Sequence, residues 1–241
     1  MVPTVTGAKQ LFAAGKLKEA IDSAGAELRD NPSDTQLRTF LFELLCFSGN
    51  WDRAEKQLEL LAGDDRSHRL GALLYLAAIQ AERTRQDMFG KGDLTPPSEA
   101  ESAPLSGSCN GVEFTSFQDA DPRLGPRLEV FAGGSYLWIP FHQVVSIEMR
   151  PPARLRDLLW TPASIQTAAG FQGGRLGEVL LPVLYPFSWR HPDDEVKLGR
   201  KTVWEESQDR EFAAGQKLFS VDGEEIPILE VRTVEIRPSS A

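Results

Sequence analysis

The stretch Gly15–Ala24, GKLKEAIDSA, recurs 34 residues later as Gly49–Leu58, GNWDRAEKQL. Both copies read Gly-x-(large apolar)-x-x-Ala-x-x-x-(apolar), and the large apolar residue is Leu17 in one copy and Trp51 in the other. In each copy a glycine that can end a helix precedes apolar residues spaced along one helical face. The repeat therefore predicts paired helices that stack on one another.

A spacing of 34 residues is the period of tetratricopeptide (TPR) helical hairpins. Hairpins of this kind stack and present a concave groove to another protein, and they carry no chemistry of their own. Ala20 and Ala54 stand where the repeat keeps a small residue, so that paired helices approach closely. We therefore expect the N-terminal part of the chain to bind a partner protein.

Signals for helix ends continue this pattern on both sides of the repeat. The sequence Asn31-Pro32-Ser33-Asp34 ends one helix at Pro32 and offers Ser33 or Asp34 as the cap of the next. The apolar spacing predicts helices over Thr6–Ala14, Leu17–Asp30, Asp34–Ser48, Trp51–Ala62 and Ser67–Met88. We expect the last of these helices to cover the apolar face that two hairpins leave open.

The composition changes sharply after this helical region. Residues 90–111 hold four Gly, three Pro and four Ser and contain no aromatic residue, so this stretch has little to bury. It is typical of a flexible linker. The sequence therefore predicts a TPR-like helical domain over residues 1–89, a linker over 90–111 and a β-rich domain over 112–241.

Short apolar runs between Gly and Pro predict the strands of the last region. Gly133-Gly134 favours a tight hairpin turn, and Asp222-Gly223 favours a second one. The strands expected are Arg127–Phe131 with Tyr136–Ile139, Val179–Leu184, and Leu218–Val221 with Ile226–Val231, which Val234–Ile236 extends after a phase shift. Only Phe141–Ser146 favours a short helix. The fold class expected is α+β, with a mostly antiparallel β domain that forms a small barrel or a sandwich.

Charge and composition exclude several classes of function. The 241 residues carry a net charge of -9, and neither half of the chain is basic, which gives no electrostatic support to nucleic-acid binding. No apolar run reaches the ~18 residues of a membrane span, and no secretion signal opens the chain. The two cysteines, Cys46 and Cys109, fit a reducing compartment. We expect a cytoplasmic protein with no membrane insertion.

No pattern marks a catalytic, metal or cofactor site. His68, His142 and His191 lie far apart in the sequence and lack the spacing of metal ligands. The glycine-rich stretch 170–177 precedes a strand rather than a helix, so it indicates a hairpin loop rather than a phosphate loop. We expect no metal, no cofactor and no enzyme activity. A hydrolase remains an alternative that would need a Ser or Asp hydrogen-bonded to His142 or His191 in a cleft.

TPR geometry predicts which residues line the groove. The first helix of each hairpin faces the concave side, so the candidate partner-binding residues are Lys9, Phe12, Thr39, Glu43, Phe47, Gln80 and Arg83. Two exposed aromatic residues in a groove would suit a helical partner. The alternative is that Phe12 and Phe47 fill the core.

Several stretches together resemble one known family. They are residues 41–54 (LFELLCFSGNWDRA), 119–126 (DADPRLGP), 128–130 with 136–141 (LEV, YLWIPF), 155–163 (LRDLLWTPA), 183–186 (VLYP) and 198–200 (LGR). In order and spacing they resemble the ImpE/TagJ family, the accessory proteins of the bacterial type VI secretion system. The resemblance covers most of the chain apart from the linker.

The resemblance implies a cytoplasmic, non-enzymatic adaptor. Its expected partner is the N-terminal helix of the small sheath subunit, and its expected place is near the ClpV-type ATPase that recycles sheaths. Family members typically have further helical sequence before the stretch 119–126, where this chain has the Gly/Pro/Ser linker. The sequence leaves open the oligomeric state, the role of the β domain and which domain contacts the partner. The alternative is a generic scaffold or regulatory protein whose β domain binds a small ligand, near Gly173–Gly177, or another protein.

Overall fold

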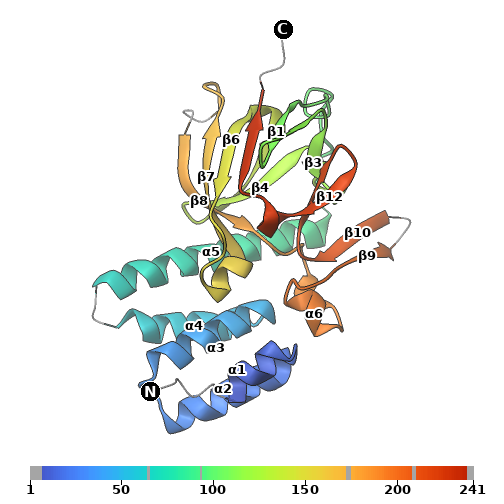
Figure 1. Cartoon of the computed structure of the whole chain (residues 1–241). Coiled ribbons are helices and arrows are strands. Elements are labelled where there is room, and N and C mark those ends of the chain that lie inside the picture. Colours follow the sequence, from blue (N-terminus) through green and yellow to red (C-terminus); the bar gives the residue numbers. More distant parts are fainter. Residues whose placement is uncertain (1–6, 64–65, 93, 172–174, 208–209, 238–241) are drawn as a thin grey trace.

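Helices and sheets form two layers of one α+β fold (Figure 1). The computed structural model describes residues 7–63, 66–92, 94–171, 175–207 and 210–237. The N-terminal helices lie on one side, and the strands that follow lie on the other. The predicted fold class, TPR-like helices followed by antiparallel sheets, is confirmed.

The helical layer contains the five predicted helices. They are α1 (Gly7–Ala13), α2 (Leu17–Asp30), α3 (Thr35–Phe47), α4 (Trp51–Ala62) and α5 (Arg66–Lys91). Of these, α2 and α4 have the predicted bounds, and α5 extends beyond its predicted end at Met88. Asp34 caps α3, because its carboxylate accepts the N–H of Leu37 at 2.9 Å. The repeat glycines Gly15 and Gly49 take left-handed φ angles of 73° and 69°, which turn the chain between the helices of each hairpin.

Eight strands form one antiparallel sheet. In order across the sheet they are β2 (Val112–Phe114), β1 (Gly107–Cys109), β13 (Thr233–Ile236), β6 (Val144–Met149), β7 (Trp160–Thr167), β8 (Arg175–Pro182), β4 (Arg127–Ala132) and β5 (Ser135–Pro140). Side chains of β7 alternate between buried and exposed, so one face of the sheet covers the core. In the described residues the edge strands β2 and β5 do not pair, so the sheet is not a closed barrel.

A smaller sheet covers the core from the other side. Its strands are β12 (Glu224–Pro227), β11 (Leu218–Val221) and β3 (Phe117–Asp119), and a separate hairpin pairs β9 (Thr202–Ser207) with β10 (Arg210–Gly215). The ring of Phe117 lies 5.1 Å from that of Phe219 and 5.0 Å from that of Phe141, which precedes β6. These aromatic contacts join the three-stranded sheet to the larger one.

Short turns complete the chain between the strands. They are the 3₁₀ turns η1 (Phe141–Gln143), η2 (Leu155–Leu158), η3 (Ser188–Arg190) and η4 (Ile228–Glu230), together with the short helix α6 (Asp194–Lys197). The predicted hairpins at Gly133-Gly134 and Asp222-Gly223 are confirmed by the pairing of β4 with β5 and of β11 with β12.

Three local predictions in the β region are wrong. Strand β13 does not extend the preceding strand, because η4 intervenes and sends the chain into the larger sheet, where β13 pairs with β1 and β6. The segment predicted as a helix from Phe141 is helical only as η1, and β6 follows from Val144, since Val144, Ile147 and Met149 are buried in the sheet core. The strand predicted from Val179 begins earlier, at Arg175.

The stretch predicted as a flexible linker carries structure at both ends. Helix α5 runs on to Lys91, and β1 begins at Gly107. Between them, Glu101 accepts a hydrogen bond from Arg127 at 2.8 Å, and Arg127 also donates to the carbonyl oxygens of Thr95 and Pro96. A single arginine on β4 therefore ties this stretch to the large sheet, although it contains little apolar material of its own.

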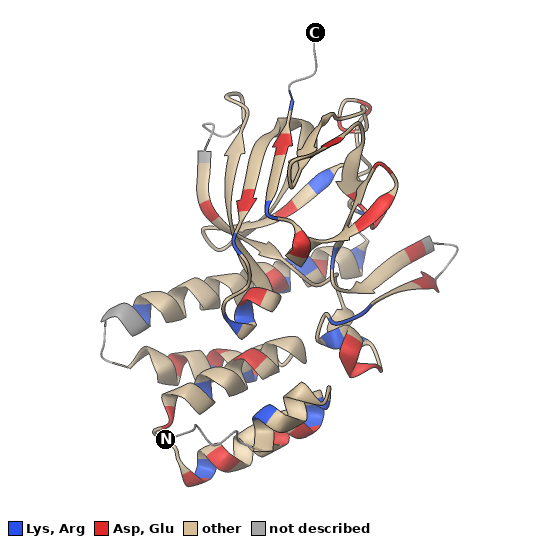
Figure 2. Cartoon of the chain, viewed as in Figure 1, with Lys and Arg blue, Asp and Glu red and all other residues tan. Residues whose placement is uncertain are grey.

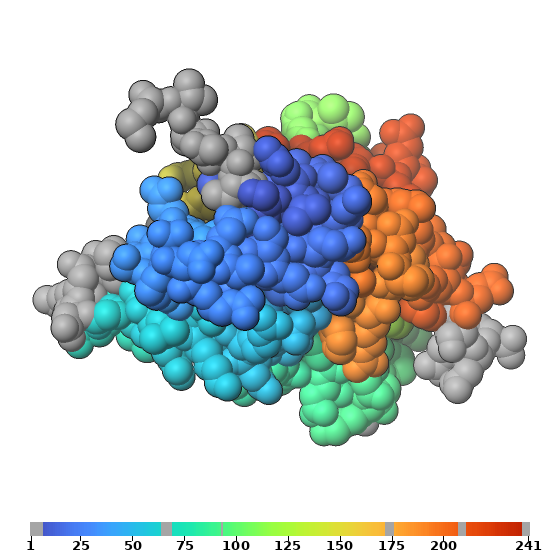
Figure 3. Space-filling model, turned by 90° about the horizontal axis from the view of Figure 1, so that it is seen from below, coloured from blue at the N-terminus to red at the C-terminus, as the bar shows by residue number. Residues whose placement is uncertain are grey.

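Two elements join the helical layer to the sheets. Helix α5 is the helix that lies against the sheets (Figure 1), and Trp160 of β7 belongs to the same apolar core as the helices. The segment η3–α6 packs against the α1–α2 turn (Figure 3), where the backbone N–H of Leu17 donates to Asp194 at 2.9 Å. The repeat hairpins thus share an apolar core with part of the large sheet, and a second core lies among the strands.

Among the residues that the structure describes, no helix has both the length and the apolar character needed to cross a membrane.

Candidate functional site

An open groove of about 290 Å³ lies where three helices of the repeat stack meet the turn η2. Its lining residues are Thr35, Gln36 and Thr39 of α3, Leu58 and Leu61 of α4, Gly71, Ala72 and Tyr75 of α5, and Arg154 and Arg156 beside β7. Leu58, Ala72 and Tyr75 are buried and form an apolar floor. Thr35, Gln36 and Arg154 are exposed and form a polar rim.

Local helix geometry places these side chains. Because Asp34 begins α3, Thr35 and Thr39 stand one helical turn apart on the same face. On α5 the pair Gly71 and Tyr75 has the same spacing, and glycine at 71 leaves the space above the floor open. The groove is therefore a property of the helical stack, closed at one end by a turn from the β region.

Asp157 fixes that turn. Its carboxylate accepts the backbone N–H groups of Ala153 and Arg154, both at 2.9 Å. This arrangement leaves Arg154 exposed at the rim and directs the next arginine, Arg156, between α3 and α5. In these contacts Asp157 positions Arg154 and Arg156 through hydrogen bonds to the backbone. Its carboxylate does not pair with the side chain of either arginine.

Arg156 makes unusual contacts for a half-buried guanidinium. Its guanidinium carbon lies 4.9 Å from the centre of the Tyr75 ring, which places a cation over the aromatic face. Its carboxylate partner is Glu43 of α3, whose Oε1 lies 3.7 Å from Nη1, beyond hydrogen-bond distance. The buried Nε of Arg156 has no hydrogen-bond acceptor among the described residues. Burial raises the pKa of Glu43 to about 7 against the lowering effect of Arg156.

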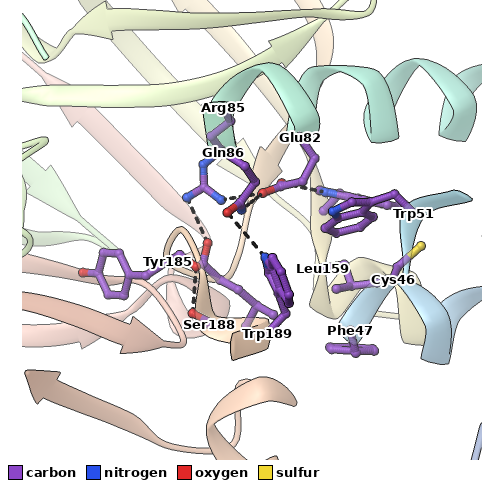
Figure 4. Close-up of a pocket in the computed structure, with 12 residues that line it drawn as sticks. Cys46, Phe47, Trp51, Glu82, Arg85, Gln86, Leu159, Tyr185, Ser188 and Trp189 are labelled. Carbon is purple, nitrogen blue, oxygen red and sulfur yellow. Dashed lines mark hydrogen bonds and ion pairs between the residues drawn. The ribbon is translucent and has the colours of Figure 1, made fainter. Parts of the chain in front are cut away.

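A second, interior cavity lies between the helices and the sheets (Figure 4). Its volume is about 20 Å³, which is room for a single water molecule and too little for a substrate. Glu82, Arg85 and Gln86 of α5 line one side, and Trp189 of η3 donates its indole N–H to Gln86 at 3.4 Å. The cavity is an imperfection of the interface rather than a binding site.

Next to this cavity a buried ionic network crosses from the helices to the sheets. Arg85 of α5 donates from Nε and Nη2 to the two carboxylate oxygens of Glu129 on β4, at 2.7 and 2.8 Å. Lys217 donates to the same Glu129 and to Asp119 of β3, both at 2.7 Å. All four side chains are almost fully buried. Arg85 also pairs with the buried Glu82 of its own helix at 3.0 Å, so two cations and three carboxylates meet within the interface.

The environments of the two carboxylates differ. Burial opposes the charged form of Glu129, but Arg85 and Lys217 together hold its pKa below the ordinary range. Burial raises the pKa of Asp119 to about 6, against the lowering effects of Lys217 and of the backbone N–H of Asp121. The Tyr185 hydroxyl donates to Asp119 at 3.2 Å, and burial strongly raises the pKa of Tyr185. These groups join the helices to the sheets through buried ion pairs and hydrogen bonds.

The structure does not bring the seven predicted groove residues together. Thr39 lines the groove, and Glu43 lies buried behind it against Arg156. Phe47 is 1% exposed and faces the interior cavity, so it fills the core, as the alternative held. The others lie elsewhere: Lys9 and Phe12 on α1, and Gln80 and Arg83 further along α5.

Two of these outlying residues have defined structural contacts. Phe12 packs edge-on against the ring of Phe40 and lies under the guanidinium of Arg200. Arg83 pairs with Asp52 at 2.8 Å and with Glu55 at 2.9 Å, which ties α5 to α4. Both side chains stabilise the stack in this structure.

The contacts of the histidines give no nucleophilic arrangement in the part of the chain that the structure describes. His191 accepts the backbone N–H of Asp193 at its Nδ1, and its Nε2 lies 3.4 Å from Glu205. Within the same described ranges no group of His, Cys, Asp and Glu side chains could hold a metal ion. The glycine-rich stretch lies between β7 and β8, and its residues 172–174 lie outside the described residues.

The chain is similar to known proteins over nearly its whole length. The sequence pattern of the ImpE protein family matches residues 111–235, and the pattern of the tetratricopeptide repeat matches residues 11–78. A Pseudomonas aeruginosa protein, the type VI secretion system accessory component TagJ, is 33% identical over 267 residues, covering 97% of this chain and 92% of the relative. The chain belongs to the ImpE/TagJ family. The resemblance seen in the short motifs is thereby confirmed.

A solved structure supports the fold assigned to this ImpE/TagJ family member. The crystal structure of the protein VPA1032 from Vibrio parahaemolyticus is similar with a TM-score of 0.82, over 96% of this chain and 98% of that chain. The two sequences are 21% identical, so the likeness concerns the fold. The alignment with the Pseudomonas relative is longer than the 241 residues of this chain, so the relative has residues without a counterpart here.

In this ImpE/TagJ family member the groove also contains Tyr75, Arg154 and Arg156, which the repeat does not predict. TPR geometry predicts the positions of residues on helices alone, whereas the two arginines lie on a turn about 80 residues further along the chain. The one available signal was that Arg156 lies in the family stretch 155–163. The stretch 155–163 lies beside the groove because its turn η2 packs against α3 of the helical stack.

Proposed function

We propose that this protein is a non-enzymatic, cytoplasmic accessory component of a bacterial type VI secretion system. Its membership of the ImpE/TagJ family supports the system, and its TPR-like stack supports a role in binding another protein. The partner proposed is the N-terminal helix of the small sheath subunit, with the ClpV-type ATPase close by. This proposal extends the expectation drawn from the family resemblance.

The observation that carries the proposal is the open groove on the helical stack. Leu58, Leu61, Ala72 and Tyr75 offer a continuous apolar floor to the apolar face of a helix. Helix-in-groove recognition requires such a floor, with anchors spaced at one and two helical turns. The same two helices, α4 and α5, also expose Leu60, Leu70, Leu73 and Leu74, each at least half exposed.

A binding titration tests this function. The probe is a synthetic, dye-labelled peptide with the sequence of the first helix of the small sheath subunit from the same organism, followed by fluorescence anisotropy. We expect saturable binding to the full chain and none by a scrambled peptide. A sheath peptide that binds no better than its scrambled copy would contradict the proposal.

Two glycine variants form a matched pair that locates the site. A Cβ added at Gly71 or at Gly25 meets nothing within 4 Å, and both glycines lie inside helices. Gly71→Trp puts a bulky ring into the groove, whereas Gly25→Trp puts the same ring on α2, outside the lining. We expect Gly71→Trp to abolish peptide binding and Gly25→Trp to leave it unchanged. Equal affinity in the two variants would place the peptide elsewhere.

A further inference from the structure

The groove opens into a larger basin at the edge of the sheets. The basin has a volume of about 690 Å³ and shares Tyr75 and Arg154 with the groove, so the two adjoin, and together we call them the trough. The basin adds Arg150 and Arg232 to the arginines already described. We name Arg150, Arg154, Arg156 and Arg232 the arginine rim.

The charge of the arginine rim differs from that of the whole molecule. The chain carries a net charge of -9, and acidic and basic residues are mixed along its helices (Figure 2). The carboxylates that line the trough are Glu148, Asp157 and Glu178, all in the basin rather than the groove. Asp157 is engaged by backbone N–H groups, so at the groove end the arginines face no carboxylate in the lining.

Arg156 gives the second, independent observation. A guanidinium carries N–H donors that are normally satisfied when buried. The buried Nε of Arg156 has no acceptor in the described residues, and its carboxylate neighbour Glu43 lies 3.7 Å away. Its side chain is 18% exposed and lines the groove. Stacking on Tyr75 holds the group in place for an incoming acceptor.

We propose that the trough binds an acidic amphipathic helix, whose apolar face covers the groove floor and whose carboxylates bond to Arg156 and Arg154. The apolar floor excludes a small free anion as the main ligand, because Leu58, Leu61 and Ala72 offer an anion nothing. The guanidinium fork matches the two oxygens of a carboxylate. This inference rests on the proposed function for the location of the groove, and it adds the charge and orientation of the partner.

The same chemistry gives the helix a direction across the trough. Its apolar side chains lie over α4 and α5, and its acidic edge lies toward η2, because the arginines are all on the β side of the groove. A helix with a basic edge would meet Arg154 and Arg156 with like charge. The partner is therefore selected by charge as well as by apolar contact.

Two designed peptides test the inference. They share one amphipathic helical sequence and differ only in the edge of the apolar face, which carries Glu in one peptide and Gln in the other. We expect the Glu peptide to bind full-length protein roughly ten- to hundredfold more tightly than the Gln peptide, and to weaken as salt is raised. Equal affinity of the two peptides, without salt dependence, would overturn the inference.

Three arginine variants assign the effect to residues. Arg156→Gln and Arg154→Gln should each reduce the preference for the Glu peptide. Because Arg154 is exposed, Arg154→Gln keeps the test valid if Arg156→Gln does not fold. Arg53→Gln, on α4 outside the lining, is the matched control and should change nothing. An unchanged preference in Arg154→Gln and folded Arg156→Gln would overturn the inference.

The sheath peptide separates this inference from the proposed function. If the sheath peptide fails to bind while the Glu peptide binds through the arginines, the inference stands and the proposed partner is wrong. If the sheath peptide binds equally well to wild type and to the Arg154→Gln and Arg156→Gln variants, the proposed partner stands and the inference is overturned.

Discussion

At the scale of single residues, the repeat glycines do more than end helices. Gly49 has a φ of 69°, and a Cβ at this position would lie 2.5 Å from the ring of Trp189. The equivalent Gly15 is approached in the same way by Glu195, whose carboxylate oxygen occupies the place of a Cβ. The 34-residue repeat thus sets two docking points for the single segment that contains η3 and α6.

We predict that Gly49→Ala destabilises the protein more than Gly133→Ala. Both glycines have left-handed φ angles, 69° and 56°, so alanine at either costs at least ~1 kcal/mol of backbone strain. Only at Gly49 does the added methyl also meet an aromatic ring, because nothing lies within 4 Å at Gly133. Urea unfolding measures the difference. Equal losses in the two variants would show that Trp189 does not dock on this turn.

Glu43 gives a prediction about pH. Burial raises its pKa in the folded state from 4.5 to about 7, so the fold binds this proton more tightly than the unfolded chain. The stability that the proton confers is therefore present at low pH and is lost as pH rises through about 7. Glu43→Gln should lose less stability than wild type between about pH 5 and pH 8 in thermal unfolding.

The exposed Glu59, also on a helix of the stack, supplies the control. Glu59→Gln should follow the wild-type pH dependence, because its side chain is in solvent. If Glu43→Gln also followed the wild type, the buried carboxyl would have no part in the pH response.

At the scale of elements, α5 has two functions along its length. Its first half supplies the groove wall with Gly71, Ala72 and Tyr75, and its second half supplies Glu82 and Arg85 to the interface with the sheets. One helix therefore fixes the position of the groove relative to the arginines that come from the β region. A shift of α5 would therefore move the groove wall and the interface with the sheets together.

We predict different costs for two neighbouring arginines of α5. Arg85→Ala leaves Glu129 with one cation fewer in a dry interior and should cost about 3–5 kcal/mol of stability. Arg83→Ala breaks pairs with Asp52 and Glu55 that are partly in solvent and should cost at most about 1 kcal/mol. Urea unfolding of both variants, read by circular dichroism, compares them. Similar losses would show that the buried network contributes no more than a surface pair.

The sequence predicts most accurately those helices and strands whose limits are set by residues within or next to the segment. The limits of α2 and α4 follow from glycines and apolar spacing inside each segment, and both helices begin and end at the predicted residues. The two hairpins follow from their turn residues in the same way. Strand β13 was misplaced because its partners, β1 and β6, lie far along the chain, and no local signal distinguishes one sheet from another.

The candidate site shows the same limit. The repeat predicts a helical groove and includes Thr39 in it, because that face depends on α3 alone. The sequence does not predict that Phe47 would be covered, or that Arg154 and Arg156 would complete the groove, because both depend on how the β region packs on the stack. Charged residues on a distant turn carry no periodic signal.

At the scale of the whole molecule, the helices and sheets form one structure with the open groove at their junction. Phe131, Trp160 and Leu180 of the large sheet belong to the apolar core of the helices, and the ring of Trp160 stacks on that of Tyr75. The β region thus supports the groove floor from below and supplies its arginines. On this account, the sheets shape the site that the TPR-like stack alone would leave incomplete.

Photo-crosslinking of the sheath peptide to the full chain tests this account most directly. The peptide carries a benzophenone side chain in place of one apolar residue, and peptide mapping by mass spectrometry identifies the labelled residues. We predict that the labels fall on the groove, within Leu58–Leu61 and Gly71–Tyr75, and that Gly71→Trp removes them while Gly25→Trp does not. Labels confined to the outer face of the eight-stranded sheet, or to the β9–β10 hairpin, would contradict it.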